Sequence, residues 1–320
     1  MRDYGRPVPG QGTGRGRTAT WEASSRGERL RVPMPRLSAR SKPARHKFKL
    51  EAAGVSTHVL RWGEGGTTPL VLLHGVLSDG ASWSGVAPRL AEGRQVLAPD
   101  MPLHGRTRTP PSFDMGPAGM SEWMAALLDS LGADRADVCG LSMGGAVAAH
   151  FAVLRGARVR RLVLVDAANI APIAGPYDGL LEEVRQAVRA KLGSGVPATS
   201  QDWTSEVGLR GPAAGASRRD TDRLIAGALR YMRWKGVPLG QLLAGLELLR
   251  PLEARQLASI TAPTLAIWGE DDPYFPAAVA AAALRANLPQ GRVEVLAGVG
   301  HNPVGERPDE SVRLISTFLA

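Results

Sequence analysis

The chain has 320 residues, of which 44% are hydrophobic and 22% charged, so it can bury a substantial core as one large domain or as a domain with an insertion. No apolar run reaches the roughly 18 residues that a membrane span needs, so we expect no membrane partner. Cys139 is the only cysteine, which excludes an internal disulfide framework and is compatible with the cytoplasmic location that we expect.

The net charge of +9 comes from the N-terminal segment. Residues 1–50 hold 13 of the 39 Lys and Arg and 3 of the 30 Asp and Glu, which leaves 26 basic and 27 acidic residues in the rest. Residues 1–45 are rich in Gly, Pro, Ser and Arg without an apolar period, so we predict a disordered basic extension without a secretion signal. A solvated extension, or a translation start at Met34, explains it better than a nucleic-acid partner.

From Lys47 the hydrophobic pattern predicts alternating strands and helices. An opening hairpin is expected around Ala53 and Gly54. The continuous apolar run PLVLLHG at 69–75 is typical of a strand that is covered on both faces. The next elements by their patterns are a helix at 80–93, a strand at 94–100, a helix at 118–132, a strand at 135–142, a helix at 143–156 and a strand at 159–168.

The alternation stops between residues 169 and 259, where only helical patterns occur, and it resumes afterwards. The later elements are a strand at 262–272, a helix at 277–289, a strand at 291–301 and a helix at 307–320. Strand–helix alternation predicts an α/β fold with a mostly parallel, doubly wound sheet. We expect a core of residues 46–168 and 260–320 and an inserted helical cap at 169–259.

The stretch VCGLSMGGAV at 138–147 places Ser142 between a predicted strand and a predicted helix. Glycines on both sides permit a tight turn that exposes the hydroxyl group at a helix N-terminus, where amide N–H groups favour negative charge. In this strand–turn–helix context the G-x-S-x-G pattern indicates a nucleophilic serine. The same serine in an ordinary glycine-rich loop is the alternative.

A serine nucleophile needs a base, and the base needs an orienting carboxylate. Of the six histidines, His301 follows a predicted strand at its carboxyl end, where ligands bind in such sheets. We read His74 as a hydrogen-bonding support, His104 as a loop brace with a direct substrate role as its alternative, His46 and His58 as exposed or structural, and His150 as too far along its helix.

The favoured orienting acid is Asp272, in the stretch WGEDDPYFP, with Asp271 and Asp166 as alternatives. The predicted chain order is then Ser142, Asp272, His301. An oxyanion hole completes such a site, and we expect it from the N–H groups of Met143 and of Val76, in the loop after LLHG. This chemistry needs neither a metal ion nor a cofactor, and we expect none.

The stretches HGVLSDGASW, DMPLHGRT, GLSMGG, GEDDPYFP and GHNPVGERPDE, in this order, resemble the α/β-hydrolase superfamily over about residues 50–320. The closest resemblance is to its capped esterase, enol-lactonase and cofactor-free haloperoxidase-like branch. Relatives often carry Gly-x-Gly after the strand-four aspartate, whereas Leu103 replaces the first glycine here. Ser142 at the nucleophile position disfavours the dehalogenase and epoxide hydrolase activities, which use aspartate.

The resemblance implies a serine hydrolase that cleaves an ester, lactone or thioester of a small-to-medium apolar substrate through an acyl-enzyme. C–C bond hydrolysis, perhydrolysis or a lyase step on the same triad is the alternative, and a ligand-sensing binding protein is a further one. A homodimer is compatible with the sequence. The side chains considered for an apolar pocket, with ordinary core packing as the alternative for each, are Trp83, Met143, Trp203, Tyr231 and Trp234.

Overall fold

The computed structural model describes residues 46–66, 68–76, 78–170, 245 and 250–320. The chain divides into two compact units, Met1–Ser41 and Lys42–Ala320, and the described residues all belong to the second. The predicted extension at 1–45 and most of the predicted cap at 169–259 lie outside the described residues. The described residues therefore belong almost entirely to the predicted core.

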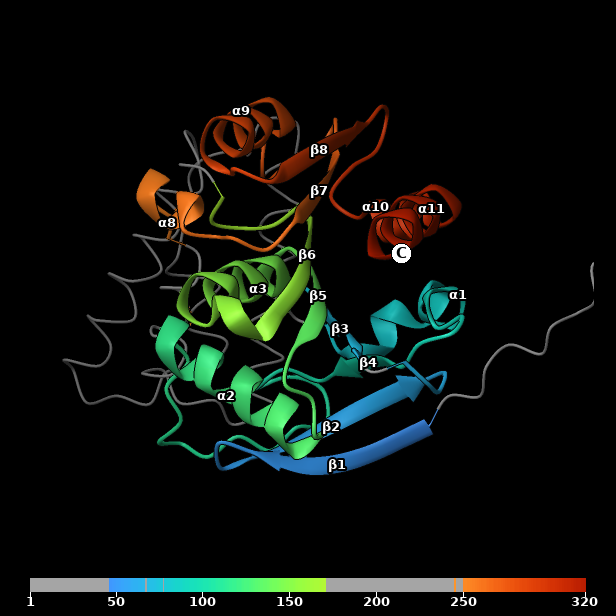
Figure 1. The fold of residues 1–320 in the computed structure, drawn as a ribbon, viewed down its shortest axis with the longest axis vertical. Coiled ribbons are helices and arrows are strands. Elements are labelled where there is room, and N and C mark those ends of the chain that lie inside the picture. The colour runs from blue at the N-terminus through green and yellow to red at the C-terminus, as the bar shows by residue number, and fades with distance from the viewer. Residues whose placement is uncertain (1–45, 67, 77, 171–244, 246–249) are drawn as a thin grey trace, which may run out of the picture. The chain divides into compact units, whose positions relative to one another are not determined.

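Eight strands form one sheet in the order β1-β2-β4-β3-β5-β6-β7-β8 (Figure 1). The strands are β1 His46–Ala52, β2 Val55–Trp62, β3 Leu70–Leu73, β4 Val96–Pro99, β5 Ala136–Leu141, β6 Val159–Val165, β7 Thr264–Gly269 and β8 Gly291–Leu296. Both β1 and β4 pair antiparallel with β2, and every other neighbouring pair is parallel. This sheet confirms the predicted fold class.

The opening hairpin turns at Ala53 and Gly54, as the sequence predicts. Both residues have a positive φ, 48° and 75°, which a two-residue hairpin turn needs to match the twist of its strands. Glycine adopts this conformation freely, whereas alanine adopts it at a cost. The hairpin adds the antiparallel edge to an otherwise parallel sheet.

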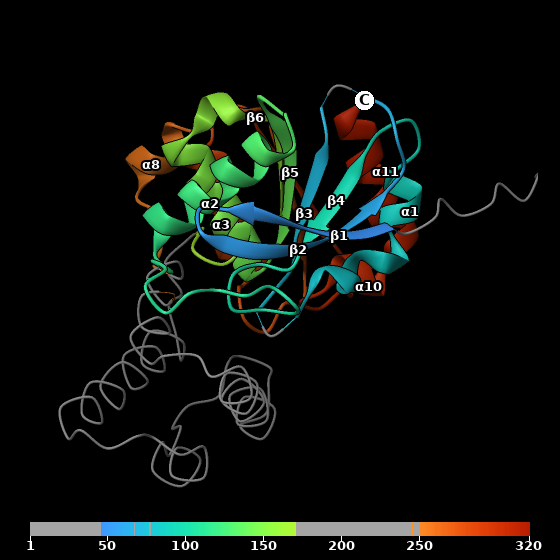
Figure 2. The ribbon, with the colours of Figure 1, turned by 90° about the horizontal axis from the view of Figure 1, so that it is seen from below.

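Helices cover both faces of the sheet, as Figure 2 shows. On one face lie α2 Pro117–Ser130, α3 Met143–Leu154, α8 Ala254–Ala258 and α9 Ala277–Asn287. On the other face lie α1 Ala87–Leu90, α10 Pro303–Glu306 and α11 Pro308–Leu319. Two short 3-10 turns complete the described elements, η1 Gly80–Gly85 and η2 Gly156–Arg158.

The helix predicted at 80–93 is broken in the structure into η1 and α1. Pro88 explains the break: it has no N–H to donate to Ser84, and its ring would collide with that carbonyl group in a continuous helix. The short helix α10 was not predicted. It follows Asn302, whose side chain accepts a hydrogen bond from the N–H of Gly305 and so caps the turn.

The core consists of two apolar layers that the sheet separates. In β3, Val71 and Leu73 belong to the layer under α2 and α3, whereas Leu70 and Leu72 belong to the layer under α1 and α11. All four side chains are buried, because alternate residues of a strand point to opposite faces and both faces are covered. This double coverage explains why PLVLLHG is a continuous apolar run.

Candidate active site

Ser142 occupies a sharp turn between β5 and α3. Its φ of 54° and ψ of −117° lie in a region that residues other than glycine rarely adopt. The side chain stands at the N-terminus of α3, where the first amide groups lack partners within the helix. Strain of this kind persists where the surrounding structure over-determines the backbone, as it does at functional sites.

Three glycines around Ser142 permit this turn because other chain segments pass too close for a side chain. A Cβ atom on Gly144 would lie 2.3 Å from the carbonyl oxygen of Leu73, and one on Gly140 would lie 2.2 Å from that of Gly144. A Cβ atom on Gly145 would lie 2.4 Å from the Cβ of Ala167. The glycines that suggested the turn in the sequence are therefore required by close packing of the end of β3, of β5 against α3, and of the segment that follows β6.

Asp272 and His301 are joined by a hydrogen bond of 2.9 Å between His301 Nδ1 and Asp272 Oδ2. The other carboxylate oxygen, Oδ1, accepts from the N–H groups of Tyr274 at 2.8 Å and Phe275 at 3.2 Å. The Asp272 side chain is fully buried, whereas that of His301 is 23% exposed. Since an ionised carboxylate only accepts hydrogen bonds, Nδ1 of His301 is the donor, and in the neutral ring Nε2 then carries the lone pair.

Close backbone packing brings together the loop after β7, which carries Asp272, and the loop after β8, which carries His301. A Cβ atom on Gly269, the last residue of β7, would lie 2.0 Å from the carbonyl oxygen of Gly300. The Glu306 carboxylate holds the His301 loop from the other side, because it accepts from the N–H groups of Gly300 at 2.9 Å and Asn302 at 3.1 Å. The loop geometry therefore fixes His301 at both of its neighbours.

Aromatic side chains surround the imidazole ring. The ring of Tyr274 meets that of His301 edge-on at 4.8 Å between centroids, and that of Phe275 lies at 5.4 Å. These are ordinary packing distances for aromatic pairs. The same short loop therefore supplies the carboxylate, the two amides that support it, and the walls that limit rotation of His301.

Ser142, Asp166, Asp272 and His301 follow four consecutive parallel strands, β5 to β8, at their carboxyl ends. Backbone hydrogen bonds link these ends: Ser142 N–H donates to Val165 and Asp166 N–H donates to Ile267. Among the described residues no hydrogen bond joins the Ser142 hydroxyl group to His301, so contact between nucleophile and base stays a prediction.

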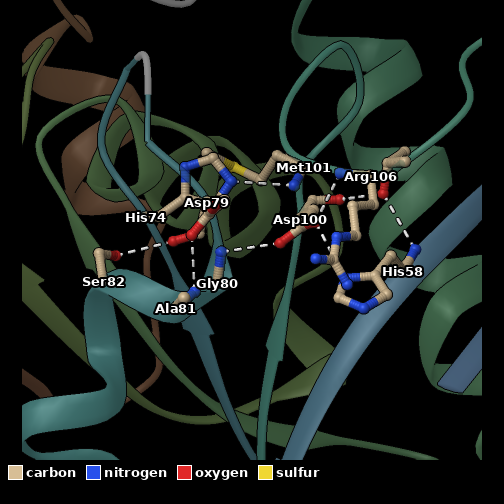
Figure 3. Close-up of polar contacts among 10 residues, drawn as sticks. His58, His74, Asp79, Gly80, Ala81, Ser82, Asp100, Met101 and Arg106 are labelled. Carbon is tan, nitrogen blue, oxygen red and sulfur yellow. Dashed lines mark hydrogen bonds and ion pairs between the residues drawn. The ribbon is translucent and has the colours of Figure 1, made fainter. Parts of the chain in front are cut away.

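The loop after β3 passes beside Ser142. A Cβ atom on Gly75 would lie 3.5 Å from the Ser142 Cβ. His74 braces this loop, because its Nδ1 donates to the carbonyl oxygen of Gly75 at 2.8 Å. Its Nε2 accepts from the N–H of Met101 at 3.0 Å (Figure 3). Burial lowers the pKa of His74 to about 4, so the ring is neutral, as both bonds require. The structure agrees with the reading of His74 as a support.

Asp100, at the end of β4, organises the neighbouring loops (Figure 3). Its carboxylate accepts from the N–H groups of Gly80 at 2.8 Å and Arg106 at 2.7 Å, and it lies 2.9 Å from His58 Nδ1. A Cβ atom on Gly105 would lie 2.1 Å from Asp100 Oδ2. This network was not predicted, although the sequence contains its signals: the aspartate that opens DMPLHGRT and the glycine five residues later.

The contacts of His104, His150 and Leu103 are structural ones: ring packing, burial in a helix and a backbone hydrogen bond. His104 packs edge-on against His74 at 5.1 Å between ring centroids, and His150 is buried on α3. Leu103, at the position where the resemblance led us to expect glycine, has a φ of 68°, the left-handed conformation that glycine would adopt without strain. Its N–H donates to the Thr109 hydroxyl group at 2.7 Å, which helps to hold this conformation.

Of the alternative acids, Asp271 is exposed, and its N–H donates to Val299. Asp166 is buried and belongs to a cluster with Asp272 and His301 whose ligand atoms all lie within 4.8 Å of one another. These three residue types can bind a metal ion, but a carboxyl ligand must lose its proton first. Burial and the charge of Asp272 raise the pKa of Asp166 to about 9, so the cluster by itself favours a protonated Asp166 at neutral pH.

The structure places Trp83 in the apolar layer under α1 and α11, where it is 1% exposed and packs with residues such as Trp62 and Leu90. Core packing, the alternative that the sequence left open, accounts for this position. Met143 is partly buried and packs against the other layer. The three other pocket candidates, which lie outside the described residues, are Trp203, Tyr231 and Trp234.

The fold and these strand-end residues define an α/β hydrolase. The family model for the alpha/beta hydrolase fold matches residues 68–308, and the chain belongs to this family. It is an enzyme of the hydrolase class.

Among its relatives, the chain is 31% identical over 265 residues to the pimeloyl-[acyl-carrier protein] methyl ester esterase of Photobacterium profundum, across 82% of this chain and 99% of the relative. It is 38% identical over 123 residues to the 2-hydroxy-6-oxo-2,4-heptadienoate hydrolase of Pseudomonas putida, across 38% of this chain and 44% of the relative. A carboxylesterase from Bacillus subtilis has a similar structure, with a TM-score of 0.63 at 19% identity, over 87% of this chain and 92% of that one.

Proposed function

We propose that this chain hydrolyses a carboxylic ester through an acyl-enzyme on Ser142, with His301 as general base and Asp272 as its orienting carboxylate. The observation that carries the proposal is the 2.9 Å hydrogen bond between His301 and Asp272, at the sheet edge where the strained Ser142 turn also lies. Nucleophile, base and orienting acid at one edge are what acyl transfer needs.

The proposed reaction has two steps. His301 Nε2 takes the Ser142 proton while the serine oxygen attacks the ester carbonyl, and Asp272 stabilises the imidazolium that forms. The N–H groups of Met143 and Val76 hold the oxyanion. The position of the loop after β3, beside Ser142, supports this role for Val76. His301 then protonates the leaving alcohol and activates the water molecule that releases the acid. No group in this cycle requires a metal ion or a cofactor.

For the substrate we propose esters of small-to-medium acyl groups, with methyl esters first. The relative of 31% identity that matches over nearly its whole length is named for a methyl ester. The predicted helical cap at 169–259 would enclose the apolar part of such a substrate.

We further propose that the protein acts in the cytoplasm. Among the described residues, no helix has the length and apolar character to span a membrane.

The test combines active-site labelling with an ester panel. A fluorophosphonate probe should label the wild-type protein at Ser142, as mass spectrometry of the labelled peptide would show. Ser142→Ala should lose labelling and lower kcat/KM on p-nitrophenyl and methyl esters by at least about 10³-fold, whereas Ser316→Ala, at an exposed position on α11, should change neither. Activity should also fall on acidification, as the base gains a proton. A folded protein that takes no label contradicts the proposal.

C–C bond hydrolysis is the second candidate. The specific observation in its favour is the 38% identity, over 123 residues, to a hydrolase named for 2-hydroxy-6-oxo-2,4-heptadienoate. Parallel assays with 2-hydroxy-6-oxo-2,4-heptadienoate, a diketone in its keto form, and with the ester panel distinguish C–C bond hydrolysis from ester hydrolysis. Turnover of the diketone at a kcat/KM above that of every ester would replace the esterase proposal.

A further inference from the structure

Asp166 is a buried carboxyl group that the proposed mechanism does not use. It follows β6, between the strand that leads to Ser142 and the strand that leads to Asp272, and it has a strained φ of 40°. The residue is fully buried. Its Oδ1 accepts from the N–H of Gly269 at 2.9 Å, whereas Oδ2 has no hydrogen-bond partner among the described residues. A buried carboxylate with one donor is poorly stabilised.

The groups around Asp166 decide which carboxyl group carries charge. Asp166, Asp272 and His301 each have a ligand atom within 4.8 Å of the others, and Glu306 adds negative charge from α10. Asp272 receives three hydrogen bonds, two from backbone amides and one from His301, whereas Asp166 receives one. Two carboxylates this close do not readily ionise together, and the better solvated one keeps the charge.

We propose that Asp166 is a second, neutral carboxyl group of the site: a positioning residue that leaves Asp272 as the single charge beside His301 and takes over that charge when Asp272 is neutralised. The proposal rests on the proposed function, because it assigns Asp166 a role through His301. Its physical content is a pair of acids that share one negative charge.

The direction of the pKa shift of Asp166 supports this transfer of negative charge from Asp272 to Asp166. Burial, the charge of Asp272 and that of Glu306 raise the pKa of Asp166 to about 9, while the hydrogen bond from Gly269 opposes the shift. Replacing Asp272 by asparagine removes the second of these causes, so the pKa of Asp166 falls and the group ionises at lower pH. The new carboxylate then lies close enough to His301 to stabilise the imidazolium.

The first experiment is a double-mutant cycle of Asp166→Asn and Asp272→Asn in the full chain, with kcat/KM on the best ester measured against pH. We expect Asp272→Asn to keep residual activity that rises with pH as Asp166 ionises. The loss caused by Asp166→Asn should be at least about tenfold larger in the Asp272→Asn background than in the wild-type background. Asp271→Asn, at the exposed neighbour, should match the wild type. Equal losses in both backgrounds, or an unchanged pH profile, overturn the take-over role.

The second experiment is independent of turnover, and its wild-type arm does not depend on the folding of any variant. Carbon-13 NMR of aspartate carboxyl groups in the wild type should show one buried resonance that titrates well above neutral pH, and in Asp272→Asn this transition should move to lower pH. A wild-type spectrum in which every carboxyl group titrates below about pH 5 overturns the proposal. Failure of the proposed function looks different: Ser142 then takes no fluorophosphonate label, while the NMR titration still decides the charge state of Asp166.

Discussion

His74 determines the direction of the Val76 amide, which we propose as an oxyanion donor. The peptide between Gly75 and Val76 is planar and trans, so its carbonyl group and its N–H point in opposite directions. Because His74 holds the Gly75 carbonyl oxygen at 2.8 Å, it also fixes the direction of the Val76 N–H. The second bond, from Met101, anchors the ring to the loop after β4. A buried neutral histidine thus pre-positions a backbone group without touching a substrate.

We therefore expect His74→Ala to lower kcat on esters by about 10- to 100-fold with little change in KM, since loss of a whole oxyanion donor costs about 10²–10³. Steady-state kinetics on the ester panel would measure the split. His150→Leu is the matched control, because His150 is also buried and neutral but lies on the far part of α3. A variant with raised KM and normal kcat would assign His74 to substrate binding instead.

At the scale of elements, the order and type of the secondary structure follow from local patterns. The hairpin, the apolar strands and helices α2, α3, α9 and α11 lie where periodicity and glycine positions predicted them. The errors have local causes: Pro88 divides the helix predicted at 80–93, and the capping side chain of Asn302 starts an unpredicted turn. Strand order was beyond the sequence, because pairing depends on contacts between distant segments.

The turn between β5 and α3 gives the clearest prediction at this scale. Gly144→Ala should abolish ester hydrolysis and lower the free energy of unfolding by about 2 kcal/mol or more, because the new methyl group would meet the backbone of β3 at 2.3 Å. Urea unfolding and the ester assay would measure both. Gly85→Ala is the control: nothing lies within 4 Å of its added Cβ, so we expect a change within about 0.5 kcal/mol. Equal stability of the two variants would contradict this account of the turn.

For the whole molecule, three buried groups give stability a dependence on pH. Burial lowers the pKa of His74 and of His150 to about 4, so between about pH 4 and 6.5 the unfolded chain binds more protons and stability rises with pH. Burial raises the pKa of Asp166 to about 9, so between about pH 4 and 9 the folded chain keeps a proton that the unfolded chain has lost, and stability falls as pH rises. These groups together favour a maximum near pH 6.5.

We expect urea unfolding between pH 4.5 and 9 to show this maximum. His150→Leu should flatten the acid limb, by an amount on the order of 3 kcal/mol when fully developed, and Asp166→Asn should flatten the alkaline limb. The direction of each change is the discriminating result, because a general loss of packing would lower the whole curve without changing its slope. An acid limb that is unchanged in His150→Leu would show that His150 titrates normally in the folded chain.

The sequence by itself determined the α/β class, the Ser142 turn and the candidates Asp272 and His301, because these depend on periodicity, on glycines beside a serine and on residues that follow strands. Tertiary structure decided that Asp272 rather than Asp271 bonds to His301, that Trp83 belongs to the core, and that His74 joins two loops. It also buried the Asp166 carboxyl group beside Asp272, and both effects raise the pKa of Asp166. The physical reason is that hydrogen-bond partners, burial and charge state arise from segments that meet only when the sheet is assembled.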